Sequence, residues 1–334
     1  MRPIAPPTDR TPPLSSSAPP TVSVIVAFHN DANHVEVAIR GLAALDYPHL
    51  EFLLVDDGST DATPTLLDTL AAEHPSLRVL HNHENEGVAA SRNRAVAEAT
   101  GEYLWFADPD DRWDAGILRD LVAGADFGAD IVVTGARIVD TQGALMRTVD
   151  VVPTAVDLPG TEALSELLRG ELSGYLWNKL VRRGLATPFP LQRSLSDLPF
   201  VAAAAASADV VRRIPGVPYT YVQHPGSITR APGGVDLDDL AHTTRAVIET
   251  ARDAPAALVT LFRYWFAILP IHTQWALRRQ AAAVAVAGLD VKVRVGEARA
   301  ILALDRRTAL KALCIRLAGP AFAPMYRFVT RGRR

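Results

Sequence analysis

From Val22 to Thr134, apolar segments of strand length alternate with helix-like segments. A strand that returns to its sheet through a helix lies parallel to the strand before it. The alternation therefore predicts an α/β fold with a mostly parallel sheet and helices on both faces. The predicted strands are Val22–Phe28, Phe52–Val55, Val79–Asn82, Tyr103–Ala107 and Ile131–Thr134, and the helices between them end near Leu45 or span Asp61–Glu73, Gly87–Ala99 and Asp114–Ala123.

Charge and cysteine content exclude several classes of protein. The chain has 34 Lys and Arg against 37 Asp and Glu, a net charge of -3, which argues against a general nucleic-acid binder. Its single cysteine, Cys314, excludes an intramolecular disulfide and a multi-cysteine metal site, and apolar neighbours predict that it is packed. We expect a cytoplasmic protein that binds no nucleic acid.

Composition divides the 334 residues into three predicted regions. Residues 1–20 hold seven of the 24 prolines and no apolar stretch of signal-peptide length, which predicts a disordered tail. Residues 21–230 carry the α/β pattern. Residues 235–334 show no clear strand and form a predicted helical appendage, with helices at Asp236–Arg252, Ala256–Arg278, Ala281–Val286 and Val295–Ile301.

Two segments of this appendage bear on membrane contact. Residues 306–334 hold eight Arg and Lys among apolar side chains and no acid, which favours peripheral contact with an anionic membrane surface. A solvated helical face is the alternative. The stretch Ala257–Leu277 approaches spanning length but includes Arg263 and His272, so we expect a buried or interfacial helix.

Polar side chains follow the predicted strands, at the edge where ligands bind in parallel α/β sheets. Asp108, Asp110 and Asp111 follow one strand, with Asp114 nearby, and they repel one another unless a cation lies among them. Carboxylates with no cysteine and little histidine suit Mn²⁺ or Mg²⁺ in an open site shared with substrate phosphates. A turn followed by a helix cap is the alternative for this loop.

Four successive segments resemble the ordered motifs of family 2 glycosyltransferases, and the resemblance covers about residues 20–228. It implies a GT-A nucleotide-diphospho-sugar transferase fold, a nucleotide-diphosphate-sugar donor such as a UDP-sugar, a divalent metal and inverting transfer of a hexosyl or N-acetylhexosaminyl group. The segments are VSVIVAFHN (22–30), VDDGSTD (55–61), NEGVAASRN (85–93) and GEYLWFADPDD (101–111).

The resemblance implies roles for residues that match the motifs. Asp57, with Asp56 beside it, resembles the carboxylate that reads the nucleobase, and Arg92 resembles the basic residue facing the nucleotide. Asp108 and Asp110 match the Asp-X-Asp motif, with Asp110 expected on the metal and Asp108 on ribose or metal. The remaining donor-site positions are Ala27, His29, Asn30, Asn93 and Asp111, of which His29 replaces an aromatic residue common in the family.

An inverting transfer needs a general base for the acceptor hydroxyl. The family commonly has Glu-Asp before a helix, and here Ser196-Asp197 matches, so the resemblance makes Asp197 the base; its alternative role is a helix cap. Trp177 and Asn178 resemble an acceptor-side segment, with a buried core Trp as the alternative. His224 matches a segment in which a histidine completes the metal shell.

These residues predict an inverting glycosyltransferase. The expected acceptor is a carbohydrate, polymer or lipid-linked hydroxyl in synthesis of a cell-envelope polysaccharide, glycolipid or teichoic-acid-like polymer. The alternative is a non-catalytic nucleotide-sugar-binding or membrane-surface scaffold protein, because Ser196 stands where the family commonly has Glu. A dinucleotide dehydrogenase and a P-loop enzyme are excluded because neither glycine motif occurs.

Overall fold

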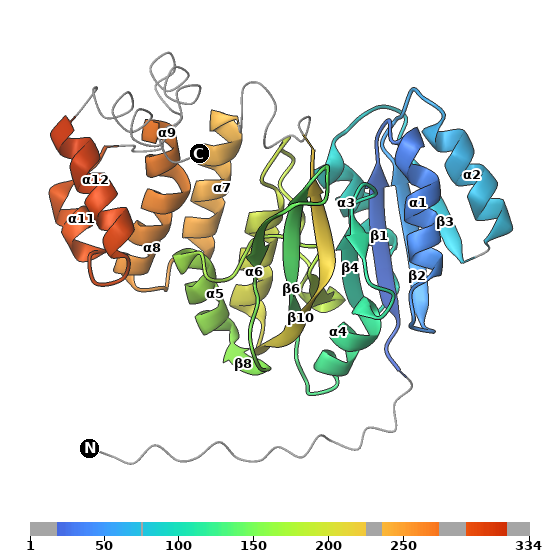
Figure 1. The fold of residues 1–334 in the computed structure, drawn as a ribbon, viewed down its shortest axis with the longest axis horizontal. Coiled ribbons are helices and arrows are strands. Elements are labelled where there is room, and N and C mark those ends of the chain that lie inside the picture. Colours follow the sequence, from blue (N-terminus) through green and yellow to red (C-terminus); the bar gives the residue numbers. More distant parts are fainter. Residues whose placement is uncertain (1–18, 75, 225–235, 274–291, 319–334) are drawn as a thin grey trace.

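The computed structural model describes residues 19–74, 76–224, 236–273 and 292–318. Within them, one mixed sheet forms the centre of the molecule (Figure 1). Its strands are β1 (Val22–Phe28), β2 (Leu50–Asp56), β3 (Leu77–His81), β4 (Tyr103–Ala107), β5 (Arg112–Trp113), β6 (Ile131–Asp140), β7 (Leu145–Val149), β8 (Val156–Pro159), β9 (Lys179–Arg182) and β10 (Val210–Gln223). The order is β3-β2-β1-β4-β9-β6-β10-β5, with β7 beside β6 and β8 beside β10.

The α/β fold predicted from the sequence is confirmed, but the sheet is mixed rather than mostly parallel. Strand β1 pairs in parallel with β2 and β4, whereas β9 runs antiparallel between β4 and β6. All five predicted strands are present. The sequence pattern missed the short strands β5, β7, β8 and β9, which have two to five residues. It also missed β10, whose register on β6 shifts between Ile214 and Tyr219 around two prolines. Proline cannot donate to a strand ladder, so the apolar pattern is broken there.

Helices cover both faces of the sheet. Buried residues of α1, α2 and α4 pack on one face, and those of α3, α5 and α6 pack on the other. Along β1, Val24 and Val26 face the first group and Ile25 faces the second, which explains the continuous apolar run. The bounds are α1 (Ala32–Ala43), α2 (Thr63–Glu73), α3 (Val88–Glu98), α4 (Ile117–Ala125), α5 (Gly160–Arg169) and α6 (Asp197–Ser207), with a short 3₁₀ turn η1 (Arg183–Leu185).

The C-terminal helices extend the molecule to one side of the sheet (Figure 1). Helix α7 (Leu237–Thr250) packs on α6, and α8 (Ala256–Phe262) packs on α5. A π-helical segment η2 (Arg263–Ile268), α9 (Leu269–Thr273), α11 (Val295–Ala300) and α12 (Arg306–Ala318) share a separate apolar cluster. None of the helices in the described ranges is long and apolar enough to cross a membrane.

The structure confirms some of the sequence predictions for the C-terminal region and contradicts one of them. Helices predicted at 236–252 and 295–301 correspond to α7 and α11, and the one predicted from 256 is present as far as Thr273. Cys314 is exposed on α12, contrary to the expectation of packing, because Ala312 and Ile315 occupy the buried positions of that helix. The predicted tail at 1–18, the boundary near 230–235, the helix at 281–286 and residues 319–334 lie outside the described residues.

Candidate active site

Asp57 lies at the end of β2 and is held by the start of α3. Its Oδ1 accepts from Asn82 Nδ2 at 2.7 Å and from the Glu86 backbone N–H at 3.0 Å, and its Oδ2 accepts from the Gly87 N–H at 2.8 Å. These three donors, two of them backbone N–H groups at the start of α3, hold the carboxylate in one orientation. About one of its four acceptor positions is left for another donor.

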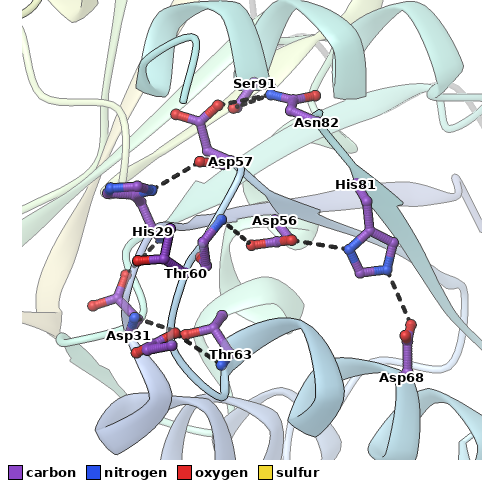
Figure 2. Close-up of polar contacts among 12 residues, drawn as sticks. His29, Asp31, Asp56, Asp57, Thr60, Thr63, Asp68, His81, Asn82 and Ser91 are labelled. Atoms are coloured by element: carbon purple, nitrogen blue, oxygen red, sulfur yellow. Dashed lines mark hydrogen bonds and ion pairs between the residues drawn. The ribbon is translucent and has the colours of Figure 1, made fainter. Parts of the chain in front are cut away.

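Asp56 points the other way, toward β3 (Figure 2). Its Oδ2 lies 3.0 Å from His81 Nδ1 and its Oδ1 accepts from the Ser59 N–H at 3.1 Å, while His81 Nε2 lies 3.0 Å from Asp68 Oδ1. Burial alone lowers the pKa of His81, but the hydrogen bonds to Asp56 and Asp68 outweigh it and raise that pKa. Asp56 thus ties the loop to β3 and α2, which corrects the expectation that it contacts the donor.

The loop after β2 meets the loop after β3 at Gly58. This residue has φ +60°, and a Cβ there would lie 2.3 Å from the Glu84 carbonyl carbon, so only glycine allows the approach. The exposed His29 ring lies beside this junction, with Nδ1 2.8 Å from the Asp57 carbonyl oxygen and Nε2 2.8 Å from Asn85 Nδ2. Phe28 is buried, so His29 is the ring that β1 presents at this edge.

Asn30, the residue after His29, holds the same loop in place, whereas Ala27 within β1 does not. Asn30 has φ +56°, and its Oδ1 accepts from the Thr60 N–H at 2.8 Å. This contact holds the loop after β2 against the end of β1. Ala27 lies half-buried within the strand and presents only a methyl group and backbone.

Arg92 on α3 joins two carboxylates from distant parts of the chain. Its Nη2 donates to Asp108 Oδ1 at 3.0 Å and its Nη1 donates to Asp197 Oδ1 at 2.6 Å. The Arg92 side chain is only 7% exposed, whereas those of Asp108 and Asp197 are 32% and 27% exposed. One buried cation therefore brings the loop after β4 and the start of α6 together and leaves part of each carboxylate open.

Asp197 is the first residue of α6 and retains an accessible side-chain surface beside Arg92. Burial raises the pKa of its carboxyl group, Arg92 acts in the opposite direction, and Asp108 adds to the rise. A carboxylate with a raised pKa accepts a proton more readily at neutral pH than an ordinary aspartate.

The carboxylates in the loop after β4 point in different directions, and Asp110 is one that is partly exposed. Asp110 is 33% exposed, and His224 Nε2 lies 3.6 Å from its Oδ2. Burial and Asp108 raise the pKa of Asp110. Across the described part of the chain no three His, Cys, Asp or Glu side chains converge on one point. Asp108, Asp110 and His224 carry oxygen and nitrogen donors of the kind that Mn²⁺ or Mg²⁺ binds, but the structure does not gather these three side chains around one point.

Asp111 is buried and turned away from this loop's open side. It accepts from Tyr219 Oη and from the Val222 N–H, both at 2.8 Å. Burial, with Asp108 and Asp110, raises the pKa of Asp111 well above its ordinary value. Asp111 anchors β10 beside the acidic loop, which corrects its expected role as a donor contact. The sequence gives no signal for Tyr219, because the prolines of β10 hide that strand.

The model of glycosyl transferase family 2 matches residues 23–185. These residues form a family 2 glycosyltransferase domain. They span β1 to η1 and include the loops that present Asp57, Arg92 and Asp108. Asp197 and His224 lie beyond the matched residues and reach the site through α6 and β10.

Two similar curated proteins of Bacillus subtilis are named as glycosyltransferases. EpsH of Bacillus subtilis, named as a glycosyltransferase, is 30% identical over 185 residues, which cover 54% of this chain and 53% of EpsH. TuaG of the same organism, named for teichuronic acid biosynthesis, is 36% identical over 94 residues, which cover 28% of this chain and 37% of TuaG. The matched part of the chain thus spans about half of the length of EpsH and less than half of the length of TuaG.

The crystal structure of S. aureus TarS residues 1–349 with UDP-GlcNAc superposes with a TM-score of 0.69. The match covers 92% of this chain and 91% of TarS at 19% identity. At that identity the likeness establishes the fold. The GT-A fold expected from the sequence is confirmed.

The two residues predicted on the acceptor side, Trp177 and Asn178, lie inside the glycosyltransferase domain rather than at its open edge. Trp177 is 3% exposed, and its ring stacks between Tyr219 and Tyr175 with centroids 4.8 and 4.7 Å away. Both ring faces are covered, so the expectation of a sugar on Trp177 is wrong. Asn178 is buried and donates to Thr134 O and Asp150 Oδ2, each at 2.7 Å.

Asn93 also has a structural role in the glycosyltransferase domain. Its Nδ2 donates to the Phe189 carbonyl oxygen at 2.9 Å, and its Oδ1 accepts from the Phe189 N–H at 2.7 Å. This reciprocal pair uses both ends of the amide and ties α3 to the segment before α6. The expected donor contact of Asn93 is corrected accordingly.

Proposed function

We propose that the protein is an inverting, metal-dependent glycosyltransferase that moves a hexosyl or N-acetylhexosaminyl group from a UDP-sugar to an acceptor hydroxyl. The observation that carries this proposal is Arg92, which joins donor-side Asp108 and the base candidate Asp197 through one guanidinium. The UDP-GlcNAc held by TarS supports the donor class. The teichuronic acid named for TuaG supports an acceptor in cell-envelope polysaccharide, glycolipid or teichoic-acid-like polymer synthesis.

The nucleotide would lie over the loops after β1 and β2. Asp57 is oriented by Asn82 and the start of α3, and its remaining acceptor position suits a base N–H. His29 presents an exposed ring beside it for contact with the base. This arrangement orients the donor so that its diphosphate extends toward the loop after β4.

Asp108, Asp110 and His224 would hold the divalent metal. When bound, Mn²⁺ or Mg²⁺ supplies positive charge for the departing diphosphate. Asp108 also stays bonded to Arg92, so its orientation is kept whether it contacts ribose or metal.

Asp197 takes the proton of the acceptor hydroxyl as that oxygen attacks the anomeric carbon. The new glycosidic bond forms on the face opposite the breaking bond to the diphosphate, so the configuration inverts. Arg92 holds the Asp197 carboxylate by one oxygen and leaves the other for the hydroxyl. Because burial and Asp108 raise the pKa of Asp197 against the effect of Arg92, this group is a competent proton acceptor.

A released-nucleotide assay tests the proposal. Purified protein is incubated with UDP-, GDP-, CDP- and TDP-sugars, each with Mn²⁺, Mg²⁺ or chelator. We expect metal-dependent release of UDP from one UDP-sugar, with slow hydrolysis before any acceptor is supplied. Release from a different nucleotide class contradicts the donor assignment, and release that survives chelator contradicts the metal requirement.

One observation favours a second candidate, a nucleotide-sugar-binding protein without catalysis. Ser196 replaces the common Glu, is 2% exposed and donates to Asp197 Oδ1 at 3.4 Å, so it supplies no second carboxylate. Thermal stabilisation by one UDP-sugar, with no release under any metal or with any of a panel of carbohydrate acceptors, supports this candidate over the enzyme.

We also propose peripheral contact with the inner face of the cell membrane through α12. This helix carries four Arg and Lys residues and no acid, and its Leu310 and Leu317 side chains are 48% and 87% exposed. Cationic and apolar groups side by side suit an anionic lipid surface. Contact of α12 with the membrane would bring the candidate active site close to lipid-linked acceptors.

A further inference from the structure

The loop that leads into Asp197 is held in a strained conformation. Leu195, two residues before Asp197, has φ +64°, a region that a branched side chain rarely occupies. Such strain persists only where the surroundings impose it, and it concentrates at functional sites. The residues that impose the strained conformation of Leu195 therefore also set the position of Asp197.

The surroundings that impose this conformation belong to α7, in the C-terminal region. Asp239 Oδ2 accepts from both the N–H and the Oγ of Ser194, each at 2.8 Å. Ser194 is buried and Asp239 is half-buried, so these bonds are partly shielded from water. Leu195 itself packs against the apolar cluster that includes Leu237 and Leu240 of α7.

A second contact from the same helix holds the other end of the loop. Gln192 Nε2 donates to Thr243 Oγ1 at 2.7 Å and to the Ser194 carbonyl oxygen at 2.6 Å. Thr243 lies one helical turn after Asp239 on α7 and is fully buried. The loop 192–196 is therefore bound at two points to one rigid helix.

We propose that Asp239 is a positioning residue for Asp197, so that α7 sets the place of the carboxylate used as general base. The inference rests on the proposed function, which gives Asp197 that role. It assigns a task to the C-terminal helices: they lie outside the matched family 2 residues, yet they fix the loop on which the reaction depends. A displacement of about 1 Å in a reacting group costs on the order of 100-fold in rate.

The chain offers a matched control in Asp238. Asp238 and Asp239 occupy the same first turn of α7, and the backbone N–H groups of both donate to Asp236. Replacing either with alanine removes one negative charge from the same helix end and the same dipole interaction. Only Asp239→Ala removes the acceptor for Ser194, and Asp239→Asn restores a neutral oxygen at that point.

The kinetic test measures kcat and KM for UDP release in the full chain, using the UDP-sugar that wild type accepts, with Mn²⁺. We expect Asp239→Ala to lower kcat about tenfold or more with KM for the donor unchanged. Asp239→Asn should recover most of kcat, and Asp238→Ala should match wild type. Equal kcat for the two alanine variants, or kcat and donor binding lost together, overturns the proposal.

A second measurement does not depend on activity. Crystal structures of the Asp239→Ala and Asp239→Asn variants show whether the contact between Arg92 Nη1 and Asp197 Oδ1 survives. We expect it to be displaced in the first and kept in the second. If Asp197 does not move in Asp239→Ala, the inference is overturned. This holds even if wild type releases no nucleotide, because the absence of release by itself contradicts only the proposed function.

Discussion

Arg92 donates a 2.6 Å hydrogen bond to Asp197 across 105 residues of sequence. The same guanidinium donates to Asp108, so two carboxylates with different proposed tasks share one buried cation. A buried cation with two anionic partners keeps both in place with little freedom. This relationship orders the candidate site before any substrate arrives.

Asp197→Asn should separate binding from chemistry. The amide oxygen still accepts from Arg92, so the donor site stays intact, but the amide cannot take a proton. We expect donor affinity by calorimetry to change little and UDP release to fall by about 100-fold or more. A variant that releases UDP at the wild-type rate contradicts the assignment of Asp197 as the base.

Asp110→Asn should remove metal-dependent donor binding. The substitution keeps the size of the side chain and deletes the charge that a hard cation needs. Calorimetry with the UDP-sugar and Mn²⁺ should show no metal-dependent affinity, whereas Asp114→Asn, outside the proposed shell, should behave as wild type. Tight binding that still responds to Mn²⁺ in Asp110→Asn excludes this residue as a ligand.

Gly174→Ala should disturb Asp197 through its neighbour Leu198. An added Cβ would lie 2.4 Å from Leu198 Cδ1, and Leu198 directly follows Asp197, the proposed base. We expect UDP release to fall about tenfold and the free energy of unfolding to fall by about 1–3 kcal/mol. Gly184→Ala is the control, since nothing lies within 4 Å of its added Cβ.

Rescue distinguishes this steric effect from general destabilisation. Leu198→Ala removes the nearest atom, so the double variant Gly174→Ala with Leu198→Ala should regain part of the lost release rate. Losses that simply add in the double variant contradict the steric explanation.

The His81 hydrogen bonds predict a pH-dependent contribution to stability. Burial opposes protonation, but Asp56 and Asp68 raise the pKa of His81 in the folded state. The folded state therefore binds the proton more tightly than the unfolded chain, whose His pKa is about 6.5. The stabilisation is fully present below that value and is lost as pH rises through the folded pKa.

Urea unfolding of wild type and His81→Gln from pH 5 to 9 measures this contribution. The difference in free energy of unfolding should be largest at the acid end and should shrink through neutral pH. A difference that stays constant across the range shows that protonated His81 adds nothing.

The membrane proposal predicts that exposed leucines of α12 bind lipid. Leu310→Ser with Leu317→Ser should lower co-sedimentation with phosphatidylglycerol vesicles, because both side chains are exposed and their loss leaves the buried Ile315 in place. Leu302→Ser, also exposed but outside α12, is the control. Equal sedimentation of the double variant and wild type contradicts contact through α12.

Local pattern is enough to predict the loops that follow β1, β2 and β4. A strand followed by a polar turn and a helix is encoded within about ten residues, so the sequence pattern alone places Asp57 and Asp108 at one edge of the sheet. The same reasoning fails for Trp177, because its burial depends on Tyr219 from a strand that begins 33 residues later and carries prolines. Ring stacking across distant strands leaves no trace in local periodicity.

Sequence alone therefore determined the α/β class, the family and the acidic edge, since each rests on short segments whose residues interact mainly with near neighbours. Tertiary structure alone decided which of two adjacent acids faces the site. Asp56 turns to His81 and Asp57 to the start of α3, because each carboxylate points to the donors that the folded loops bring to it. The link from Arg92 to Asp197 likewise exists only once α3 and α6 pack on the same face of the sheet.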